Sequence, residues 1–438
     1  MVERTVAVLV VGGGAAGMAA AAAVGRAAPS VMLCDEGPML GGRARRGERD
    51  PIGAGVEIRL STAVVDIDSD RRVIAYGPHG LERIVARAIV LAVGARDEAV
   101  LFEGWTLPGV MTADAMRVVA IPAGALAARR VVVVGVGTEA RLAADQAARA
   151  GAGAVRLVAA GAIEAAFGSE RVERVAIVGD EGEREELPAE VVVLAASRAP
   201  ALEAAQLAGA RFLYVAPLGG WVPVYGHDLQ ATVPGIFVAG GAAGVDAPAA
   251  SELTGRIAGL GALATLDGGG DDGAIDRLWT SLAAHSTPER MAARALLQRA
   301  KTDAALATEG NTWSREGTAT GSARAPVIRD RARGIEPWTV VCPCEDVTVA
   351  EVRECVEQGA RSPDDVKRMT RCGMGACQWR VCRPLVAAEM SRALGVPLDA
   401  IPLPNVRFPL RPIPLGALAE GAGEQEGGIV RSVLSEVE

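Results

Sequence analysis

The sequence predicts an α/β protein with two Rossmann-like dinucleotide-binding domains and a small cysteine-rich C-terminal domain. Three observations support this prediction. A short apolar strand runs into a glycine-rich turn and an Ala-rich helix, and this arrangement occurs twice. Six of the seven cysteines fall between Cys342 and Cys382. The 438-residue length leaves room for about three domains of roughly 150 residues each.

Composition excludes several classes of protein. The formal net charge of −8 argues against a general nucleic-acid binder, which would show a basic face. Three histidines are too few for a His-rich metal site. The uncharged run Val6–Val24 is interrupted by four glycines, so it is a poor signal peptide and a poor membrane span. We therefore expect a soluble, cytoplasmic protein without a transmembrane segment.

The first glycine-rich turn has the context of a dinucleotide site. Thr5–Val11 is predicted to be a buried parallel strand, and a helix is expected to follow through Ala28. The next strand, Val31–Cys34, ends in two acids about 20 residues beyond the glycines. The glycines fit G-x-G-x-x-G, and the residues of this unit are Gly12, Gly14, Ala15, Ala16, Gly17, Asp35 and Glu36.

Each of these residue types has a physical role. The first glycine permits a tight turn, the second lets the backbone approach a pyrophosphate, and the third lets the helix pack against the strand. The helix N-terminus supplies amides and a partial positive charge to the phosphates. A carboxylate after the second strand suits a ribose hydroxyl.

A second unit of this kind follows. Arg129-Arg130 introduces the strand Val131–Val134, which enters Gly135-Val136-Gly137 with alanine in the third motif position. No acid or arginine closes the next strand, Val155–Ala159. A second Rossmann-like fold is predicted, whereas nucleotide binding there and a purely structural role both stay open.

Other segments are predicted to complete the two domains. Strands are expected over Gly55–Asp68, Ile84–Val93 before Gly94, Val191–Ala195, and Ile236–Gly241. A helix is expected from Pro248 to Leu266, and residues 276–302 are predicted to be helical. The strand that ends in Gly240-Gly241 is in a position to return to the first nucleotide site.

We assign five regions. Residues 1–120 and 216–267 form the first dinucleotide-binding domain, and 121–215 form the inserted second Rossmann-like domain. Residues 268–338 are a helical and flexible connector, with Thr308–Ala325 rich in Gly, Thr and Ser. Residues 339–395 form the cysteine-rich domain. Residues 396–438 are an extended segment with an acidic tail that is expected to be disordered.

The clustered cysteines indicate a metal centre and a reducing compartment rather than disulfides. Cys342-Pro343-Cys344 is followed by Cys372, Cys377 and Cys382. Four thiolates in two close pairs suit a [2Fe–2S] cluster, and a Cys₄ zinc site is the alternative, although C-x-C is not the usual zinc spacing. Five cysteines compete for four places, and their spacing does not select among them. Cys355, on the apolar face of a short helix over Val349–Gln358, and Cys34 are predicted to be buried structural thiols.

The chain resembles the larger, A- or α-type subunits of opine oxidases, dye-linked proline or hydroxyproline dehydrogenases and hydrogen cyanide synthase. The resemblance includes Val11–Gly17, Asp35-Glu36 with Gly41-Gly42, and Gly104–Thr112. It continues through Val233–Gly240, the cysteine segment and Arg411–Leu418. The cysteine segment also resembles the ferredoxin-like domain of bacterioferritin-associated ferredoxin. That pattern, C-x-C…G-M-G-x-C-Q-x-x-x-C, assigns Cys342, Cys344, Cys377 and Cys382 as ligands and leaves Cys372 as the spare.

The resemblance implies a fold like that of pyridine-nucleotide disulfide reductases, without their redox cysteine pair. It implies a [2Fe–2S] cluster and FAD, and it allows FMN at a subunit interface and ATP or NAD(P) in the second nucleotide site. The implied partner is an FAD-dependent amine or amino-acid oxidase-like β subunit, and a small third subunit is also compatible. The candidate nucleotide-binding residues are Gly12, Gly14, Ala15, Ala16, Gly17, Asp35, Glu36, Gly42, Arg43, Gly94, Gly135, Gly137, Gly240 and Gly241.

Three departures from the family pattern bear on function. Val56 follows Gly42 closely, where the family runs through a longer segment. Gly241 replaces the family's aspartate, which removes an acceptor for the flavin ribityl chain. Pro343 stands in the C-x-C step, where it has no amide to donate to a cluster. Trp379 replaces the usual glycine and is expected to shield the cluster from solvent.

These residues lead to three hypotheses. The first is an electron-transfer subunit of a flavin-dependent amine or amino-acid dehydrogenase that relays electrons through the cluster. The second is an NAD(P)H-dependent flavoprotein reductase with a fused [2Fe–2S] domain. The third is a degenerate scaffold that carries the cluster. No residue is assigned as a catalytic acid or base, and Asp97, Glu98 and Asp114 are equally compatible with solvated loop positions.

Overall fold

The computed structural model describes residues 1–25, 27–44, 52, 55–123, 125–126, 128–179, 181–267, 271–303 and 335–422. The chain forms two compact units, which are described separately below. Unit 1 consists of Met1–Ala95, Ala199–Gly317 and Val406–Glu438, and unit 2 of Arg96–Arg198 and Thr318–Asn405. Two of the boundaries, at 95/96 and 198/199, fall within the short strands β7 (Ala95–Asp97) and β15 (Arg198–Pro200).

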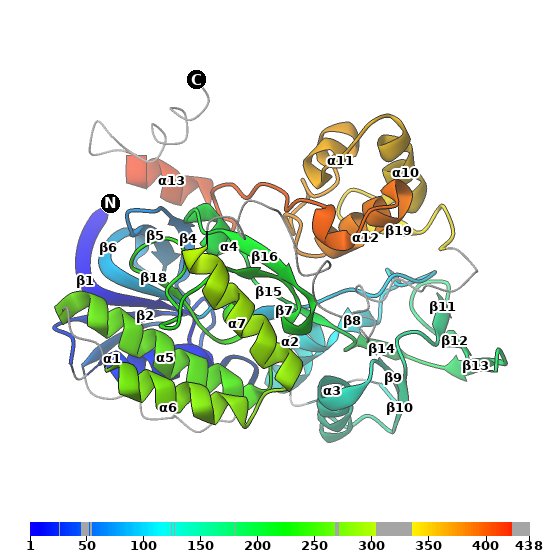
Figure 1. Cartoon of the computed structure of the whole chain (residues 1–438). Helices are drawn as coiled ribbons and strands as arrows, with labels where there is room; N and C mark the ends of the chain where they lie inside the picture. The colour runs from blue at the N-terminus through cyan, green and yellow to red at the C-terminus, as the bar shows by residue number, and fades with distance from the viewer. Residues whose placement is uncertain are drawn as a thin grey trace. The chain divides into compact units, whose positions relative to one another are not determined.

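Unit 1 is built on a mixed sheet with the order β3-β2-β1-β6-β5-β4 (Figure 1). Three strands at one side of the sheet are parallel, namely β1 (Val2–Val11), β2 (Val31–Cys34) and β3 (Val56–Arg59). On its other side β1 pairs in parallel with β6 (Gly80–Leu91). The first half of β6 pairs with the antiparallel β5 (Arg72–Gly77), and its last residues pair with β18 (Ile236–Val238). The remaining strand, β4 (Ala63–Ile67), pairs with β5.

Two helices of unit 1 approach each other unusually closely. These are α1 (Ala15–Val24) and α5 (Pro248–Asp267). A Cβ on Gly255 would lie 2.1 Å from the Ala16 carbonyl oxygen, and one on Gly259 would lie 2.8 Å from that of Ala20. Only glycine permits this approach, which fixes the helix that follows the first glycine loop. α1 ends at Val24, earlier than predicted, where Gly25 packs against Val56.

The rest of unit 1 covers the sheet and its edges. It comprises α4 (Glu203–Leu207), β16 (Phe212–Val215), β17 (Gly220–Pro223), α6 (Asp272–Ala283), α7 (Pro288–Thr302) and the 3₁₀ turns η1 (Gly42–Ala44), η2 (Ala216–Leu218) and η3 (Gly240–Ala243). The C-terminal segment, expected to be extended, contains helix α13 (Leu415–Ala422). This helix forms because its apolar residues pack with Phe408 and Ile413 on the Val65, Ile74 and Leu81 face of the sheet.

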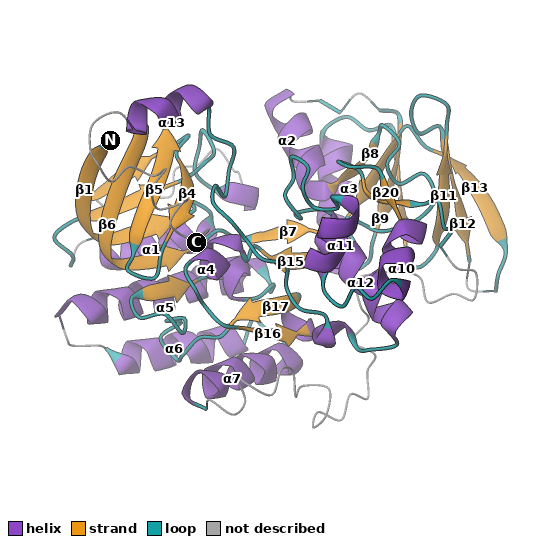
Figure 2. Ribbon diagram, turned by 90° about the horizontal axis from the view of Figure 1, so that it is seen from above, coloured by secondary structure: helices purple, strands orange, loops and turns teal. Residues whose placement is uncertain are grey.

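Unit 2 contains a second parallel sheet with the order β10-β9-β14-β8. Its strands are β8 (Val110–Thr112), β9 (Arg130–Val134), β10 (Ala154–Val158) and β14 (Val191–Leu194), with helices α2 (Ala113–Ala123) and α3 (Gly137–Arg149). Because β8 pairs with β14, this sheet includes residues that precede the expected boundary at 121. An antiparallel sheet of β11 (Ile163–Phe167), β12 (Arg174–Val178) and β13 (Arg184–Pro188) is also present (Figure 2).

The cysteine-rich region of unit 2 is mainly helical. It contains β19 (Val340–Cys342), β20 (Val347–Thr348), α10 (Val349–Glu357), α11 (Pro363–Thr370), α12 (Cys382–Leu394) and the 3₁₀ turn η4 (Leu398–Ala400). Capping boxes at Thr348 and Ser362 start α10 and α11. The prediction of an α/β fold with two glycine-loop sheets and a helical C-terminal domain is thus confirmed. The predicted connector Thr308–Ala325 and the tail beyond residue 422 lie outside the described residues.

Candidate functional site: two glycine loops and a five-thiol centre

The first glycine loop has the geometry of a phosphate-binding turn. Gly12 has a φ of +103°, and a Cβ there would lie 2.4 Å from the Ala92 carbonyl oxygen. A Cβ on Gly17 would lie 1.7 Å from the Gly12 carbonyl oxygen, whereas nothing lies within 4 Å of the equivalent position on Gly14. Two glycines are therefore required by packing, while the third leaves open space beside the N-terminus of α1.

The two acids after β2 differ in their surroundings. Asp35 accepts hydrogen bonds from the amides of Gly13 (2.5 Å) and Gly37 (2.7 Å). Its carboxylate therefore stabilises the conformation of the glycine loop. Glu36 is exposed and makes a two-point ion pair with Arg411, with Nε 2.6 Å and Nη2 3.1 Å from its oxygens. A carboxylate has about four acceptor positions, so both acids retain capacity for a ribose hydroxyl.

Other predicted residues gather at the same loop. A Cβ on Gly42 would lie 3.1 Å from Gly14 Cα, and Arg43 follows it in η1. A Cβ on Gly240 would lie 2.7 Å from the Ala16 side chain. Gly241 packs on the Gly94–Ala95 backbone, where its Cβ would meet Ala95 N at 2.8 Å. These residues form a backbone-lined cradle that fits a dinucleotide such as FAD, without the aspartate that the family carries at position 241.

A buried ion-pair network was not predicted from the sequence. Arg294, only 1% exposed on α7, donates to Tyr225 Oη and to the Ala243 carbonyl at 3.1 Å each and to Asp246 Oδ2 at 3.2 Å. Asp246 also accepts from Ser286 and Arg290. Burial raises the pKa of the Tyr225 phenol. The network holds the end of η3, and an arginine within the apolar stripe of α7 was the available sequence signal.

The second glycine loop has the correct backbone but a poor ligand environment. A Cβ on Gly135 would lie 2.3 Å from the Ala195 carbonyl oxygen, while the Cβ position of Gly137 is open. Val136, between them, is 70% exposed. The strand β10 leads into the exposed Ala159, which offers no side-chain acceptor to a ribose. Nucleotide binding at Gly135 and Gly137 stays a prediction.

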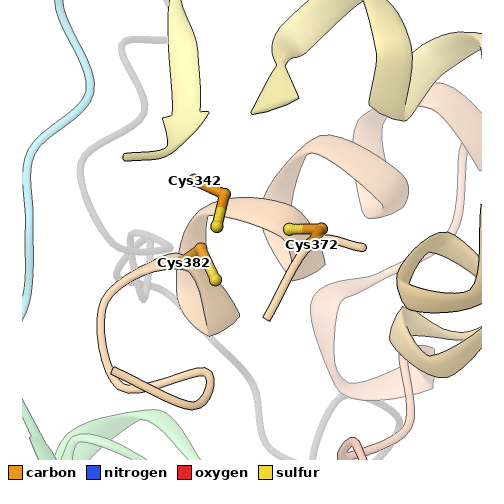
Figure 3. A group of neighbouring side chains, drawn as sticks. All are labelled: Cys342, Cys372 and Cys382. Carbon is orange, nitrogen blue, oxygen red and sulfur yellow. The ribbon is translucent and has the colours of Figure 1, made fainter. Parts of the chain in front are cut away.

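The predicted metal centre is assembled from three places in the sequence. Cys342 ends β19, Cys372 follows α11, and Cys382 begins α12 (Figure 3). Their sulfur atoms lie within 4.8 Å of one another, and all three residues are buried. Cys377 is half-buried and hydrogen-bonded to both Cys382 and the exposed Cys344. The structure thus brings together all five competing thiols, including Cys372.

Two assignments of four ligands therefore fit the contacts. The set that the resemblance implies consists of Cys342, Cys344, Cys377 and Cys382, and it is connected by contacts of Cys382 with Cys342 and of Cys377 with Cys382 and Cys344. Cys342 with Cys372 and Cys377 with Cys382 form two pairs equally well. The four ligands named from the resemblance stay a prediction. Cys355 (4% exposed) and Cys34 (1% exposed) lie in hydrophobic cores, and burial raises the pKa of Cys34 to about 12.

Hydrogen bonds to sulfur are concentrated at this site. Cys342 sulfur accepts from the Cys382 thiol and from the amides of Gly373, Cys344 and Glu345, which lowers its pKa to about 5. Pro343 has no N–H, and the amides that donate to this sulfur belong to other residues. Cys377 accepts from Cys382 and from the amides of Val381 and Arg380, and its pKa is likewise lowered to about 5. Cys382 has a single thiol proton to share between these two sulfurs, and retaining that proton raises its pKa.

The surrounding backbone is held in unusual conformations. Asp346, Arg371, Gln378 and Trp379 all have positive φ values, which non-glycine residues seldom adopt. A Cβ on Gly375 would lie 2.2 Å from Cys344 Cβ. Such strain is maintained only where the surrounding structure requires it, and it commonly marks a binding site. Clustered thiolates with converging amide donors fit an iron–sulfur cluster, in which such hydrogen bonds tune the potential.

The Gly104–Thr112 motif supports this centre. Trp105 is 8% exposed, and its Nε1 donates to the Val340 carbonyl at 2.7 Å. Val340 begins the strand that ends in Cys342. Trp105 also shares a hydrophobic core with Cys342, Cys372 and Cys382. The motif therefore positions the strand that carries the first thiol.

Comparison with known proteins agrees with this architecture. Residues 6–176 match the pyridine nucleotide-disulphide oxidoreductase family, and residues 337–422 match the sarcosine oxidase A3 domain family. The crystal structure of L-proline dehydrogenase from P. horikoshii has the same fold, with a TM-score of 0.74 at 23% identity over 95% of this chain and 80% of that chain. None of the helices that the structure describes combines the length and apolar character needed to cross a bilayer.

Two curated relatives are similar along most of their length. The A-type subunit of opine oxidase from Agrobacterium tumefaciens (strain Ach5) is 29% identical over 94% of this chain and 91% of the relative. Hydrogen cyanide synthase subunit HcnB of Pseudomonas aeruginosa is 27% identical over 93% and 97%. The first alignment spans 483 positions, more than the 438 residues here, so that relative carries segments that this chain lacks. The chain is therefore a homologue of the A-type subunit of opine oxidase and of the HcnB subunit of hydrogen cyanide synthase, built on a pyridine nucleotide-disulphide oxidoreductase fold with a C-terminal A3-type region.

Proposed function

We propose that this chain is the electron-transfer subunit of a hetero-oligomeric, flavin-dependent amine or amino-acid dehydrogenase. In this proposal a β subunit resembling amino-acid oxidases oxidises the C–N bond of the substrate, and this chain relays the electrons. Two of its relatives are named as subunits of larger enzymes, which supports the expectation of a partner. FMN between subunits and ATP or NAD(P) in the second site remain predictions of the resemblance.

The observation that carries the proposal is the five-thiol centre. Cys342, Cys372 and Cys382 form a buried group, with Cys377 and Cys344 continuing it to the surface. A [2Fe–2S] cluster held there supplies one-electron transfer. The protein contributes the thiol ligands, the amide donors and the hydrophobic shell, and the first glycine loop supports FAD binding in unit 1. An entry or exit for electrons at the exposed Cys344 is consistent with a relay.

Metal analysis of the full chain, purified anaerobically with its partner, tests the proposal. We expect two irons and two acid-labile sulfides per chain, together with FAD released on denaturation. Addition of an opine or proline-type substrate should bleach the cluster absorbance only when the partner is present. Zinc in place of iron and sulfide would contradict the relay. Bleaching of the isolated chain by NADH would instead favour a self-sufficient reductase.

A flavin-free, cluster-carrying scaffold is the second candidate. It is favoured by the packing of Gly241 against the Gly94–Ala95 backbone, which leaves no room for the family's aspartate. Loss of one charge-assisted hydrogen bond weakens binding by about 1.5–3 kcal/mol. Iron and sulfide without any released flavin would support this second candidate over the first.

A further inference from the structure

Trp379 is the feature of the five-thiol centre that the family pattern does not explain. It lies between Cys377 and Cys382 in sequence and is 5% exposed. Its φ of +68° is unusual for a bulky residue. The indole Nε1 is buried and has no hydrogen-bond acceptor among the residues that the structure describes. Two unfavourable features thus coincide at one side chain.

The indole of Trp379 packs directly against Gly373. An ideal Cβ on Gly373 would lie 2.3 Å from Trp379 Cε2 and 2.8 Å from Nε1, so the ring occupies the space that any other residue at 373 would fill. The Gly373 amide itself donates to Cys342 sulfur. The indole therefore lies beside a residue whose amide already hydrogen-bonds a sulfur of this centre.

A buried donor without an acceptor is rare, because it loses its hydrogen bonds to water and gains nothing in return. The contrast with Trp105 is informative, since that indole, in the same core, donates to the Val340 carbonyl. For Trp379 no protein acceptor is found among the described residues, while a bound cluster would bring sulfur atoms into the space between Cys342, Cys372 and Cys382.

We propose that the Trp379 indole N–H donates a hydrogen bond to a sulfur atom of the iron–sulfur cluster and so raises its reduction potential. The inference rests on the proposed function in that it requires a cluster. No bond is formed or broken. On one-electron reduction the cluster gains one negative charge, so a donor stabilises the reduced form more than the oxidised form. Trp379 is thus a tuning residue rather than a catalytic one.

The variant Trp379→Phe keeps the aromatic packing against Gly373 and removes only the N–H. We expect it to retain iron and sulfide at the wild-type level and to be reduced at a lower midpoint potential in an anaerobic redox titration followed by EPR. Trp279→Phe in helix α6 of unit 1 is the matched control: its indole N–H donates to the His227 carbonyl at 2.8 Å, and loss of that bond should leave the potential at the wild-type value.

A second measurement detects the indole nitrogen directly. With [15N]-indole-labelled tryptophan, pulsed EPR of the dithionite-reduced wild type should detect a nitrogen coupled to the cluster, and this coupling should disappear in Trp379→Phe. An unchanged potential in an iron-loaded Trp379→Phe protein, or wild-type protein without the nitrogen coupling, would overturn the inference. Wild-type protein that lacks iron and sulfide would instead refute the proposed function, so the two failures are distinguishable.

Discussion

Asp35 Oδ2 accepts a hydrogen bond from the amide of Gly13 at 2.5 Å. The first acid after β2, which was predicted to bind a ribose hydroxyl, therefore also stabilises the glycine loop. Its other oxygen accepts the amide of Gly37. The carboxylate thus links the turn before α1 to the turn after β2. The conformation of the first glycine loop therefore depends on this residue before any ligand arrives.

The substitution Asp35→Asn tests that dependence. An amide side chain has one carbonyl oxygen, so one of the two backbone donors is left facing an N–H₂ group. We expect the free energy of unfolding to fall by about 1–3 kcal/mol and the flavin content to fall with it. Chemical denaturation and cofactor release measure the two effects. Glu36→Gln, which removes the charge from the exposed ion pair with Arg411, should change stability by less than about 1 kcal/mol. Equal effects of the two substitutions would contradict this assignment.

Restoring the family's aspartate at position 241 should not restore a stronger flavin site. The Cβ of Gly241→Asp would lie 2.8 Å from Ala95 N and 2.9 Å from Gly94 C, and this backbone cannot move aside as a flexible side chain would. We expect overpacking to lower stability by about 1–3 kcal/mol and to reduce flavin content. Thermal unfolding and flavin titration check this. Gly416→Ala, at a position with open space, is the control. Tighter flavin binding by Gly241→Asp would be contrary to the expectation.

Single cysteine substitutions will decide which four thiols bind the cluster. If the resemblance is correct, Cys344→Ser should lose most of its iron and Cys372→Ser should keep it. If the buried group of Cys342, Cys372 and Cys382 supplies three ligands, the two results are exchanged. Cys382→Ser should lose iron in either case. Cys355→Ser is the control, because that thiol is buried in the same core but outside the group. Iron and sulfide content per chain is the readout, and retention by both Cys344→Ser and Cys372→Ser would contradict both assignments.

Much of the fold followed from local patterns in the sequence. Val31–Cys34 forms β2 with the predicted bounds, and the Gly12 and Gly135 turns each join a strand to a helix as expected. The antiparallel pairing of β5 with the first half of β6 was not predicted, because a 12-residue strand that changes partners along its length leaves no periodic signal. Pairing of this kind is decided by tertiary contacts rather than by local propensity.

The site was predicted less completely than the fold. The sequence identified the thiols and the glycine loop, because these chemistries depend on residue type and spacing. Spacing alone did not predict whether Cys372 is a ligand, and only the resemblance made it the spare thiol. The distance from Cys372 to Cys342 depends on where α11 ends relative to β19, which is a tertiary contact. Arg294 and Asp246 are 48 positions apart, and their pairing depends on the packing of α7 against η3. An arginine in an apolar stripe signals a buried charge, but no local sequence pattern identifies its distant partner.

Thiol reactivity in the metal-free protein should follow pKa rather than exposure. The Cys382 hydrogen bond and two backbone amides lower the pKa of Cys377 to about 5, whereas burial raises the pKa of the exposed Cys344 above its ordinary value of 9.0. The thiolate is the nucleophile, so the reactive fraction of Cys377 rises between about pH 4 and 6 and that of Cys344 only above about pH 9. At pH 6.5, iodoacetamide should label Cys377 faster, as peptide mass spectrometry can measure. Faster labelling of Cys344 would show that exposure controls the reaction.

Removal of the buried arginine of α7 should affect the first nucleotide site from a distance. Arg294→Met keeps much of the side-chain volume but leaves the 2%-exposed Asp246 carboxylate without one of its two cationic partners. The Ala243 carbonyl loses one of its two donors and keeps the other, Tyr225 Oη. Breaking a buried ion pair costs about 3–5 kcal/mol, so we expect a large fall in the free energy of unfolding. Arg290→Met removes the partly exposed partner of the same carboxylate and should lower the free energy of unfolding by less.

Because Ala243 ends η3, which begins at Gly240, flavin content should fall more in Arg294→Met than in Arg290→Met. Urea unfolding and flavin release measured on both variants test this, and equal flavin content in the two would show that the network stabilises unit 1 without shaping the cradle.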